Sequence, residues 1–575
     1  MNIKLKLKQH IVQSLTRNGI ENNNNLLINN TYQKKPWHYQ INGIIKIAKK
    51  INQDPYKLAC NIVSEIRIYE MYHTIQVSKP GFINIFLNEK WIEKKLEKKM
   101  KSIRLNVKLV EPQNIVIDYS SPNMAKEMHV GHLRSTIIGD ATARIMEFLG
   151  HNVIRINHIG DWGTQFGMII TYLKENKKIN RITENTNFNK IYQKSKIEYE
   201  TNETFFNKTK KNILKLQSGD KHYINIWRKI VDTTIKKNEK IYKKLNVTLT
   251  NEHIVGESFY KNMLPNIVND LKTKNIAVEH HGATMIFLKK FKNRYGQPMG
   301  IIIQKQDGTF LYATIDLACL KYRYDVLHAD KILYYTDTRQ HQYLMQIVEI
   351  GRLANYIPNH VQIEHHMFGM ILSENNHPFK TRSGNSIKLS SLLDEAIQRA
   401  KIIAKQKNPT LSKKKIDFLS RKIGIGAIKY FDLSKNRSNN YVFNWNNILS
   451  FNGNTAPYIQ YAYTRILSIF KKLKISMLHL EGKIKLIELC EKKLGLKLLQ
   501  FEEIIIETAN KGMPNILCTY LYELSTIFSH FYETCSILLS KNIEMRFSRL
   551  NLAFLTARTL KLGLNILGIS TINYM

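Results

Sequence analysis

The chain has 575 residues and 43% of them are hydrophobic, so at roughly 100–200 residues per domain it predicts about three ordinary domains. The formal net charge of +40 favours a polyanionic partner such as RNA. An A+T-rich coding sequence, which the abundance of Lys, Asn and Ile indicates, would raise the charge without such a partner. The sequence has no run of about 18 uncharged apolar residues, which argues against a membrane span, and no signal-peptide core.

The five cysteines lie far apart and form no CxxC pair: Cys60, Cys319, Cys490, Cys518 and Cys535. This spacing predicts neither disulfides nor a cysteine zinc site. We therefore expect a cytoplasmic protein without a metal site of its own.

Residues 1–105 are predicted to form a small α/β domain. Phe82–Leu87 indicates a strand that opens at Pro80-Gly81, and Glu89–Lys101 indicates a helix leading to the next domain.

Residues 106–404 are predicted to form a parallel, doubly wound α/β domain of Rossmann-like type. A β-branched run at 115–119 indicates a buried strand, and a second strand is expected at 152–157. Between them, Gly150 ends a helix whose apolar positions recur every three to four residues: Leu133, Ile137, Ala141, Ile145 and Phe148. In this fold, ligands bind beyond the carboxyl ends of the strands.

The rest of the chain is predicted to be mainly helical. Residues 172–250 indicate a helical insertion, strands are expected at 301–303 and 331–335, and helical periodicity fills 405–575.

Two histidines mark the loop before the first predicted helix. His129 and His132 lie three apart on the first turn, where backbone N–H groups favour phosphate, and Gly131 lets a nucleotide approach closely. A bare HxxH could also bind zinc or be two surface histidines, but no cysteine lies nearby to complete a zinc site.

The segment around these histidines resembles a known signature. His129-Val130-Gly131-His132 resembles the HIGH motif of class I aminoacyl-tRNA synthetases, and the longer run 121–135 is similar to the form found in the arginyl-tRNA synthetase family. Segments at 158–167, 256–260, 311–316, 364–369 and 454–465 continue the resemblance in order, over nearly the whole chain.

The resemblance implies a three-domain ligase of bacterial type. Its expected parts are a tRNA-binding domain over 1–105, a class I catalytic domain with a helical insertion over 106–404, and an all-α anticodon-binding domain over 405–575. Its expected reaction converts ATP, as Mg-ATP, and L-arginine to arginyl-adenylate, and then charges the 3′ end of tRNA-Arg. A monomer is expected.

The resemblance also implies an ATP site. His129, His132 and Gly131 are expected at the triphosphate. Where most class I enzymes carry a KMSKS signature, this chain has the degenerate segment 379–384, in which Lys380, Thr381 and Arg382 are expected to contact ATP. Lys126 is expected to supply the missing lysine charge.

Arginine selection requires a carboxylate, which can accept the planar guanidinium through two hydrogen bonds. Tyr312 and Asp316 lie four apart and would share a helix face. By resemblance they contact the guanidinium, with Glu257 as a second acid. The remaining residues of the arginine site are expected to be Ser121, Pro122, Asn123, His132 and Gln340.

The expected tRNA contacts lie at both ends of the chain. Tyr458, Tyr461 and Arg465 recur at i, i+3 and i+7, so the rings could stack on anticodon bases, although tyrosines of such a face can also belong to the core. Asn84 is a further candidate. Two alternatives remain open: a class I synthetase for another amino acid, and a non-catalytic RNA-binding descendant, which would not be expected to keep both histidines and the acids.

Overall fold

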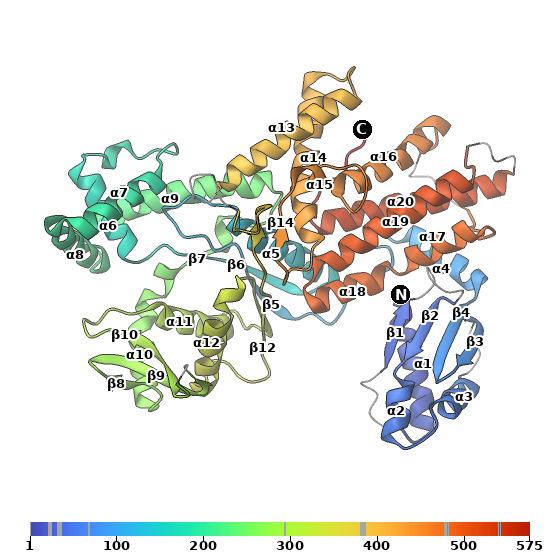
Figure 1. Cartoon of the computed structure of the whole chain (residues 1–575), viewed down its shortest axis with the longest axis horizontal. Coiled ribbons are helices and arrows are strands. Elements are labelled where there is room, and N and C mark those ends of the chain that lie inside the picture. Colours follow the sequence, from blue (N-terminus) through green and yellow to red (C-terminus); the bar gives the residue numbers. More distant parts are fainter. Residues whose placement is uncertain are drawn as a thin grey trace. The chain divides into compact units, whose positions relative to one another are not determined.

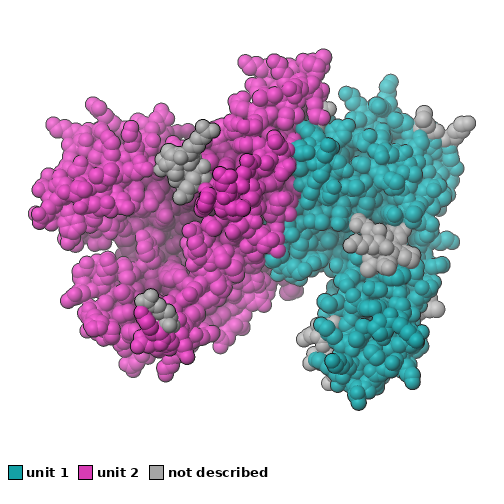
Figure 2. Space-filling model, in the orientation of Figure 1, with its two compact units in different colours: residues 1–109, 450–565, 570–575 teal, residues 110–449, 566–569 magenta. Residues whose placement is uncertain are grey.

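The computed structural model describes residues 2–20, 26–30, 37–66, 70–292, 295–379, 387–476, 480, 482–538, 540 and 542–574. The chain divides into two compact units, coloured in Figure 2: one comprises Met1–Leu109, Ser450–Asn565 and Ser570–Met575, and the other Val110–Leu449 and Ile566–Ile569. The division into domains 1–105, 106–404 and 405–575 stays a prediction. None of the described helices is long and apolar enough to cross a membrane.

The amino-terminal part of the first unit is an antiparallel sheet of order β1-β2-β4-β3 together with helices α1 to α4 (Figure 1). The predicted strand and helix are confirmed as β4 and α4, and Asn88 caps α4 by accepting the Trp91 N–H at 3.3 Å. The elements are α1 (Ile3–Arg17), β1 (Leu27–Asn30), β2 (Tyr39–Asn42), α2 (Ile44–Lys50), α3 (Pro55–Glu65), β3 (Tyr72–Ser78), β4 (Phe82–Leu87) and α4 (Glu89–Lys101).

The carboxyl-terminal part of the first unit is helical, as predicted. Its central helix, α19, packs against α16, α17 and α18, and Leu517, Leu521, Leu524 and Phe528 are fully buried along it. The helices are α16 (Ala456–Leu473), α17 (Leu489–Leu499), α18 (Phe501–Lys511), α19 (Pro514–Thr534) and α20 (Ile543–Ile566).

The second unit is built on a parallel five-stranded sheet of order β12-β11-β5-β6-β7. Its strands are β5 (Asn114–Asp118), β6 (Asn152–Ile159), β7 (Ile254–Gly256), β11 (Lys331–Tyr334) and β12 (Gln362–His365). The chain proceeds from β5 to β6 and β7 on one side and later to β11 and β12 on the other. This confirms the doubly wound fold and puts the topological switch point beside β5, where such sheets bind ligands.

Helices follow the sheet strands as the sequence predicts. Gly150, at φ 103°, ends α5 in the left-handed conformation expected of a C-terminal cap. The α-helices of this unit are α5 (Gly131–Leu149), α6 (Thr164–Glu175), α7 (Phe188–Thr201), α8 (Glu203–Gln217), α9 (Lys221–Lys244), α10 (Leu264–Thr273), α11 (Tyr312–Asp325), α12 (His341–Leu353), α13 (Leu389–Lys407), α14 (Lys413–Leu433) and α15 (Trp445–Ile448). Residues 172–250 are thus mainly helical, through α7, α8 and α9.

A small antiparallel sheet packs against three helices, one of which, α11, carries Tyr312 and Asp316. It has the order β10-β9-β8, with β8 (Val278–His280), β9 (Ala283–Lys292) and β10 (Pro298–Gln304), and its buried side packs with α10, α11 and α12 into one apolar core. The shorter elements are β13 (Ile371–Leu372), β14 (Tyr441–Val442), and the 3-10 turns η1 (Ile179–Arg181), η2 (Asn251–His253), η3 (Glu257–Met263) and η4 (Thr338–Gln340).

Candidate active site

The loop after β5 is held at the carboxyl edge of the parallel sheet. Ser120, Ser121 and Ala125 adopt positive φ angles of 71°, 45° and 57°, which allow the chain to turn sharply between strand and helix. Asn123 forms a parallel bridge with Gly160, directly after β6. A Cβ atom at Gly160 would lie 2.2 Å from Asn123 Oδ1, so this close approach requires glycine.

The two histidines of the HVGH segment face each other, but not as neighbours on one helical turn. Helix α5 begins at Gly131, so His129 precedes the helix and only His132 lies within it. Their ring centroids are 4.0 Å apart. The His129 backbone N–H donates to His132 Nδ1 at 3.1 Å, and the Gly131 N–H donates to His129 Nδ1 at 3.1 Å. This local turn therefore brings the rings together, in place of the shared helix face expected from their spacing.

Both imidazoles are held neutral by their surroundings. Burial, and secondly the neighbouring His129, lower the pKa of His132 to about 3, and burial together with Lys126 lowers the pKa of His129. Because Nδ1 of each ring accepts a backbone N–H, the hydrogen of each neutral ring lies on Nε2. The pair thus offers two N–H donors at the start of α5, where the helix dipole also favours an anion.

Lys126 lies near this pair and against the helical insertion. Its Nζ stands 4.7 Å from the ring centroid of Tyr192 on α7. Burial, and secondly Lys196, lower the pKa of Lys126.

Residues 387–389 run alongside the HVGH segment. The Val130 N–H donates to Ile387 O at 3.0 Å, and the Leu389 N–H donates to Met128 O at 2.9 Å. Lys388 and Glu127 form an ion pair at 2.6 Å. Lys380, Thr381 and Arg382, which the sequence assigns to ATP, lie outside the described residues.

The predicted acidic pair belongs to a larger group of buried carboxyls. Glu257 begins η3 and Asp316 lies on α11. Burial raises the pKa of Glu257 to about 8, and the charges of Asp161 and Asp316 add to this rise. Burial also raises the pKa of Asp316, whose Oδ2 accepts a hydrogen bond from Tyr343 Oη at 2.5 Å. His158 and Arg323 act in the opposite direction on Asp316, and a group of carboxyls of this kind is suited to bind a further cation.

Tyr312 completes this side of the site. It is the first residue of α11 and is 65% exposed, so its ring is open to a ligand. Burial of its hydroxyl, and secondly the charge of Glu257, raise its pKa. The four-residue spacing on a helix is confirmed, with Asp316 more covered than Tyr312.

The other predicted arginine-site residues lie along the same sheet edge. Ser121 Oγ donates to Asp118 Oδ1 at 2.8 Å, and the Ser121 N–H donates to Asn157 Oδ1 at 3.0 Å. Pro122 is buried and Asn123 is exposed. Gln340 is exposed in η4, which follows β11.

Four residues near this edge were assigned no role from the sequence: His158, Asp161, Tyr343 and Arg323. The last of these forms an ion pair with Asp118. Asp161 accepts hydrogen bonds from the Ser258 N–H at 2.9 Å and from Ser258 Oγ at 2.6 Å. The buried Nδ1 of His158 has no hydrogen-bond partner among the described residues. His158 and Asp161 stand in segment 158–167, whose resemblance could have identified them, whereas Tyr343 carries no such signal.

The predicted tRNA residues of α16 form a surface with α19. Tyr461 is 44% exposed. Tyr458 lies 5.5 Å from Tyr522, between ring centroids, and the Arg465 guanidinium lies 4.7 Å from the ring centroid of Tyr532.

Asn84, the other tRNA candidate, is buried in the amino-terminal sheet. Its Oδ1 accepts a hydrogen bond from Gln40 Nε2 at 2.9 Å, and its Nδ2 donates to Ser78 Oγ at 3.1 Å. A direct RNA contact would have to compete with these two bonds.

Three sequence families match the chain in succession. The Arginyl tRNA synthetase N terminal domain matches residues 5–87, the class I (R) tRNA synthetase catalytic domain matches residues 92–445, and the DALR anticodon binding domain matches residues 459–575.

Curated relatives and solved structures agree with these matches. The chain is 61% identical to an arginine--tRNA ligase of Buchnera aphidicola subsp. Baizongia pistaciae and 49% identical to one of Pectobacterium atrosepticum, over 100% of each chain. It resembles the crystal structure of the Plasmodium falciparum arginyl-tRNA synthetase with a TM-score of 0.87 and 32% identity, over 100% of both chains. The Thermus thermophilus arginyl-tRNA synthetase shares the fold, with a TM-score of 0.84 and 22% identity over 100% of both chains. By its full-length sequence relatives and its catalytic-domain match, the chain belongs to the arginyl-tRNA synthetase family.

Proposed function

We propose that the chain is an arginine--tRNA ligase that activates L-arginine with ATP and transfers it to the 3′ end of tRNA-Arg, in translation. In the first step, the arginine carboxylate attacks the α-phosphorus of ATP, and the bond to pyrophosphate breaks. In the second, the terminal ribose hydroxyl of the tRNA attacks the arginyl carbonyl and AMP leaves. No covalent bond to the protein is required.

The neutral histidine pair supports the ATP half of this proposal. His129 and His132 each direct an Nε2–H donor at the start of α5, beside the exposed backbone of Gly131. Donors that are already oriented stabilise the charge that develops on phosphoryl oxygens, without reorganising during the reaction. We expect Mg²⁺ to enter with ATP, bound to its phosphates.

The observation that carries the choice of amino acid is the buried carboxyl group of Glu257 and Asp316. Burial raises the pKa of both acids, and the charge of Asp316 adds to the rise at Glu257, so the two groups lie close together. A guanidinium would bring a positive charge to this group and could donate hydrogen bonds to both acids through its fork of N–H groups. Ser121, Pro122, Asn123 and Gln340 would line the amino-acid end of the site, at the switch point of the sheet.

The tRNA would be read by the face of α16. Tyr458 and Tyr461 would stack on unpaired bases, and Arg465, whose guanidinium lies over Tyr532, would contact phosphate. Asn84 would contribute only after rearrangement of its bonds to Gln40 and Ser78. The cytoplasmic location and the monomeric state remain predictions.

The test is ATP–pyrophosphate exchange with each of the twenty amino acids, in the presence and absence of tRNA-Arg. The proposal expects exchange with arginine alone, and dependence on tRNA as in the family generally. Exchange with another amino acid, or tRNA binding without any exchange, would overturn it in favour of a different synthetase or a non-catalytic RNA-binding protein.

A further inference from the structure

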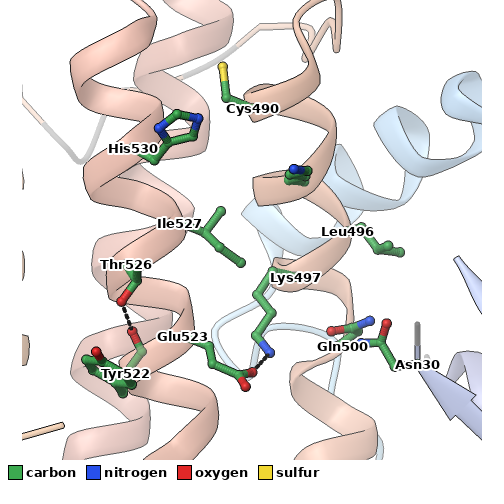
Figure 3. A pocket seen from close by; sticks show the side chains of 11 residues that line it. Asn30, Cys490, Leu496, Lys497, Gln500, Tyr522, Glu523, Thr526, Ile527 and His530 are labelled. Atoms are coloured by element: carbon green, nitrogen blue, oxygen red, sulfur yellow. Dashed lines mark hydrogen bonds and ion pairs between the residues drawn. The ribbon is translucent and has the colours of Figure 1, made fainter. Parts of the chain in front are cut away.

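A groove of about 320 Å³ lies between α17 and α19 of the first unit (Figure 3). Leu496 and Ile527 form its apolar sides, and Lys497 of α17 pairs with Glu523 of α19 across it. Cys490 and His530 stand on the facing helices at one end of this groove. The Lys497–Glu523 pair lies toward the other end of the groove in Figure 3, so it does not separate Cys490 from the groove.

A second thiol lies directly behind Cys490. The Sγ atoms of Cys490 and Cys535 are 2.8 Å apart, although the two residues are separated by 45 positions in the sequence. A disulfide bond is roughly 2.05 Å long, so joining the two sulfurs requires a movement of less than about 1 Å. Both residues are buried, and all five cysteines of the chain are free thiols in the structure.

The backbone on both sides of this pair is fixed by hydrogen bonds. Cys490 lies in the first turn of α17, where Glu491 accepts the N–H groups of Ile487 and Glu488 at 2.9 Å. Cys535 ends α19, and its N–H donates to Phe531 O at 2.8 Å. Arg549 of α20 bonds Glu491 Oε1 at 2.8 Å. The short distance between the sulfurs is therefore set by three helices and not by a free loop.

We propose that Cys490 and Cys535 are a modification site, at which a peroxide converts two thiols to an intramolecular disulfide. The sulfur of Cys490, a residue that lines the groove, attacks one oxygen of hydrogen peroxide. The O–O bond breaks, and a sulfenic acid and water form. The Cys535 sulfur then attacks the sulfenic sulfur and displaces a second water. The balance is two thiols and one peroxide to one disulfide and two waters.

The order of the two steps follows from position, because Cys490 is among the residues that line the groove and Cys535 is not. Burial, and secondly its neighbour Cys490, raise the pKa of the Cys535 thiol, which makes it a poor first nucleophile. Once Cys490 is oxidised, Cys535 is already within bonding reach, and the second step is intramolecular. Of the other cysteines, Cys518 is buried on α19 and Cys60 is half-buried on α3.

The test uses the full-length reduced protein, treated with hydrogen peroxide, quenched with acid, unfolded and titrated for free thiols. The proposal expects the five thiols to fall to three, a peptide linking residues 490 and 535 in mass spectrometry, and recovery of five thiols with dithiothreitol. Cys490→Ser should keep its four thiols, Cys535→Ser should lose only the Cys490 thiol and give no linked peptide, and the matched control Cys518→Ser should fall from four thiols to two.

Two results would overturn the proposal: retention of all five thiols, or linkage through Cys60, Cys319 or a second molecule on a non-reducing gel. Loss of thiols that dithiothreitol does not restore would also contradict it. The linked peptide is sought in the unaltered protein, so the outcome does not depend on how the serine variants fold. It is also independent of the proposed ligase activity, which can fail or hold separately.

Discussion

The backbone N–H of His129 donates to Nδ1 of His132 at 3.1 Å, so that the second histidine of the pair is oriented by the main chain of the first. This bond fixes the hydrogen of the neutral His132 ring on Nε2. The Nε2–H group of His132 is therefore the donor that would contact the phosphates of ATP.

Two variants, His132→Gln and His132→Asn, distinguish the contribution of Nε2 from that of Nδ1. Glutamine can put an amide N–H near the Nε2 position, whereas asparagine reaches only the Nδ1 position. We expect His132→Asn and His132→Ala to lower the rate of ATP–pyrophosphate exchange by about 10²–10³-fold, and His132→Gln to lower it by less. His129→Ala should resemble His132→Ala, with tRNA binding largely kept in each. Equal losses for the Gln and Asn variants would contradict the assignment of Nε2.

Lys126 is predicted to act on the phosphates of ATP in place of the absent KMSKS lysine. Lys126→Ala should slow activation while arginine binding is largely kept, because Lys126 acts on His129, whose pKa it lowers, whereas the charges that act on Glu257 are those of Asp161 and Asp316. Lys196→Ala is the matched control, since Lys196 is the neighbouring cation on α7. If Lys126→Ala leaves exchange intact and Lys380→Ala abolishes it, the charge comes from the degenerate segment instead.

Arginine binding is predicted to release a proton from the acidic group. The pKa of Glu257 is about 8 in the free protein, so this carboxyl is mostly protonated at pH 7, and the guanidinium binds its ionised form. Arginine affinity should therefore fall as the pH drops below about 8, by up to tenfold per unit. Calorimetry in buffers of different ionisation enthalpy, with the tRNA bound, measures the released proton.

Glu257→Gln supplies the control, because it removes the titrating group and should flatten the pH dependence. Arginine binding to the unaltered protein without proton release, and with a flat pH profile, would contradict this prediction.

The raised pKa of Glu257 also makes the stability of the folded protein depend on pH. The folded state holds this proton between about pH 4.5, the ordinary value, and pH 8, whereas the unfolded state has lost it, so Glu257 lowers the free energy of unfolding as pH rises through this window.

The exposed face of α16 is predicted to bind tRNA through its rings. Tyr458→Ala and Tyr461→Ala should each raise the KM for tRNA, since a stacking contact contributes about 1–3 kcal/mol. Tyr461→Phe keeps the ring and should behave almost as the unaltered protein, and Ser468→Ala, on the same helix, serves as a surface control. Unchanged charging at low tRNA concentration in both alanine variants would indicate that the rings belong only to the α16–α19 packing.

Local signals predicted much of the fold because they act within one element. The residues of β4, α4 and α5 carry their own turns and caps: Gly81 before β4, Asn88 before α4 and Gly150 after α5. The order of strand, helix and strand around α5 then predicts the parallel sheet, since such crossovers join parallel strands.

The contacts between distant segments could not be predicted in this way. Tyr343 Oη bonds Asp316 across 27 positions, and Ser258 bonds Asp161 across 97. The periodicity of a single helix cannot predict either of these hydrogen bonds, because each joins two separate segments. The histidine rings show the same limit at short range: their spacing predicts a shared helical face, but the start of α5 at Gly131 leaves His129 outside the helix.

The identity of the amino acid is the central claim, and Asp316 carries most of it. Asp316→Asn keeps the shape and can still accept the hydrogen bond from Tyr343, but it removes the charge that faces the guanidinium. Leaving a buried cation without its partner costs on the order of 3–5 kcal/mol, which is a loss of about 10²–10³-fold or more in kcat/KM for arginine. Citrulline, which has nearly the same shape and no charge, should lose much less.

The most direct measurement is therefore tRNA-dependent ATP–pyrophosphate exchange with arginine and with citrulline, in the unaltered protein and in Asp316→Asn. The account predicts a strong preference for arginine in the unaltered protein and a preference reduced by at least about 10²-fold in the variant. An unchanged preference for arginine over citrulline in Asp316→Asn would contradict it and would assign the selection to Glu257.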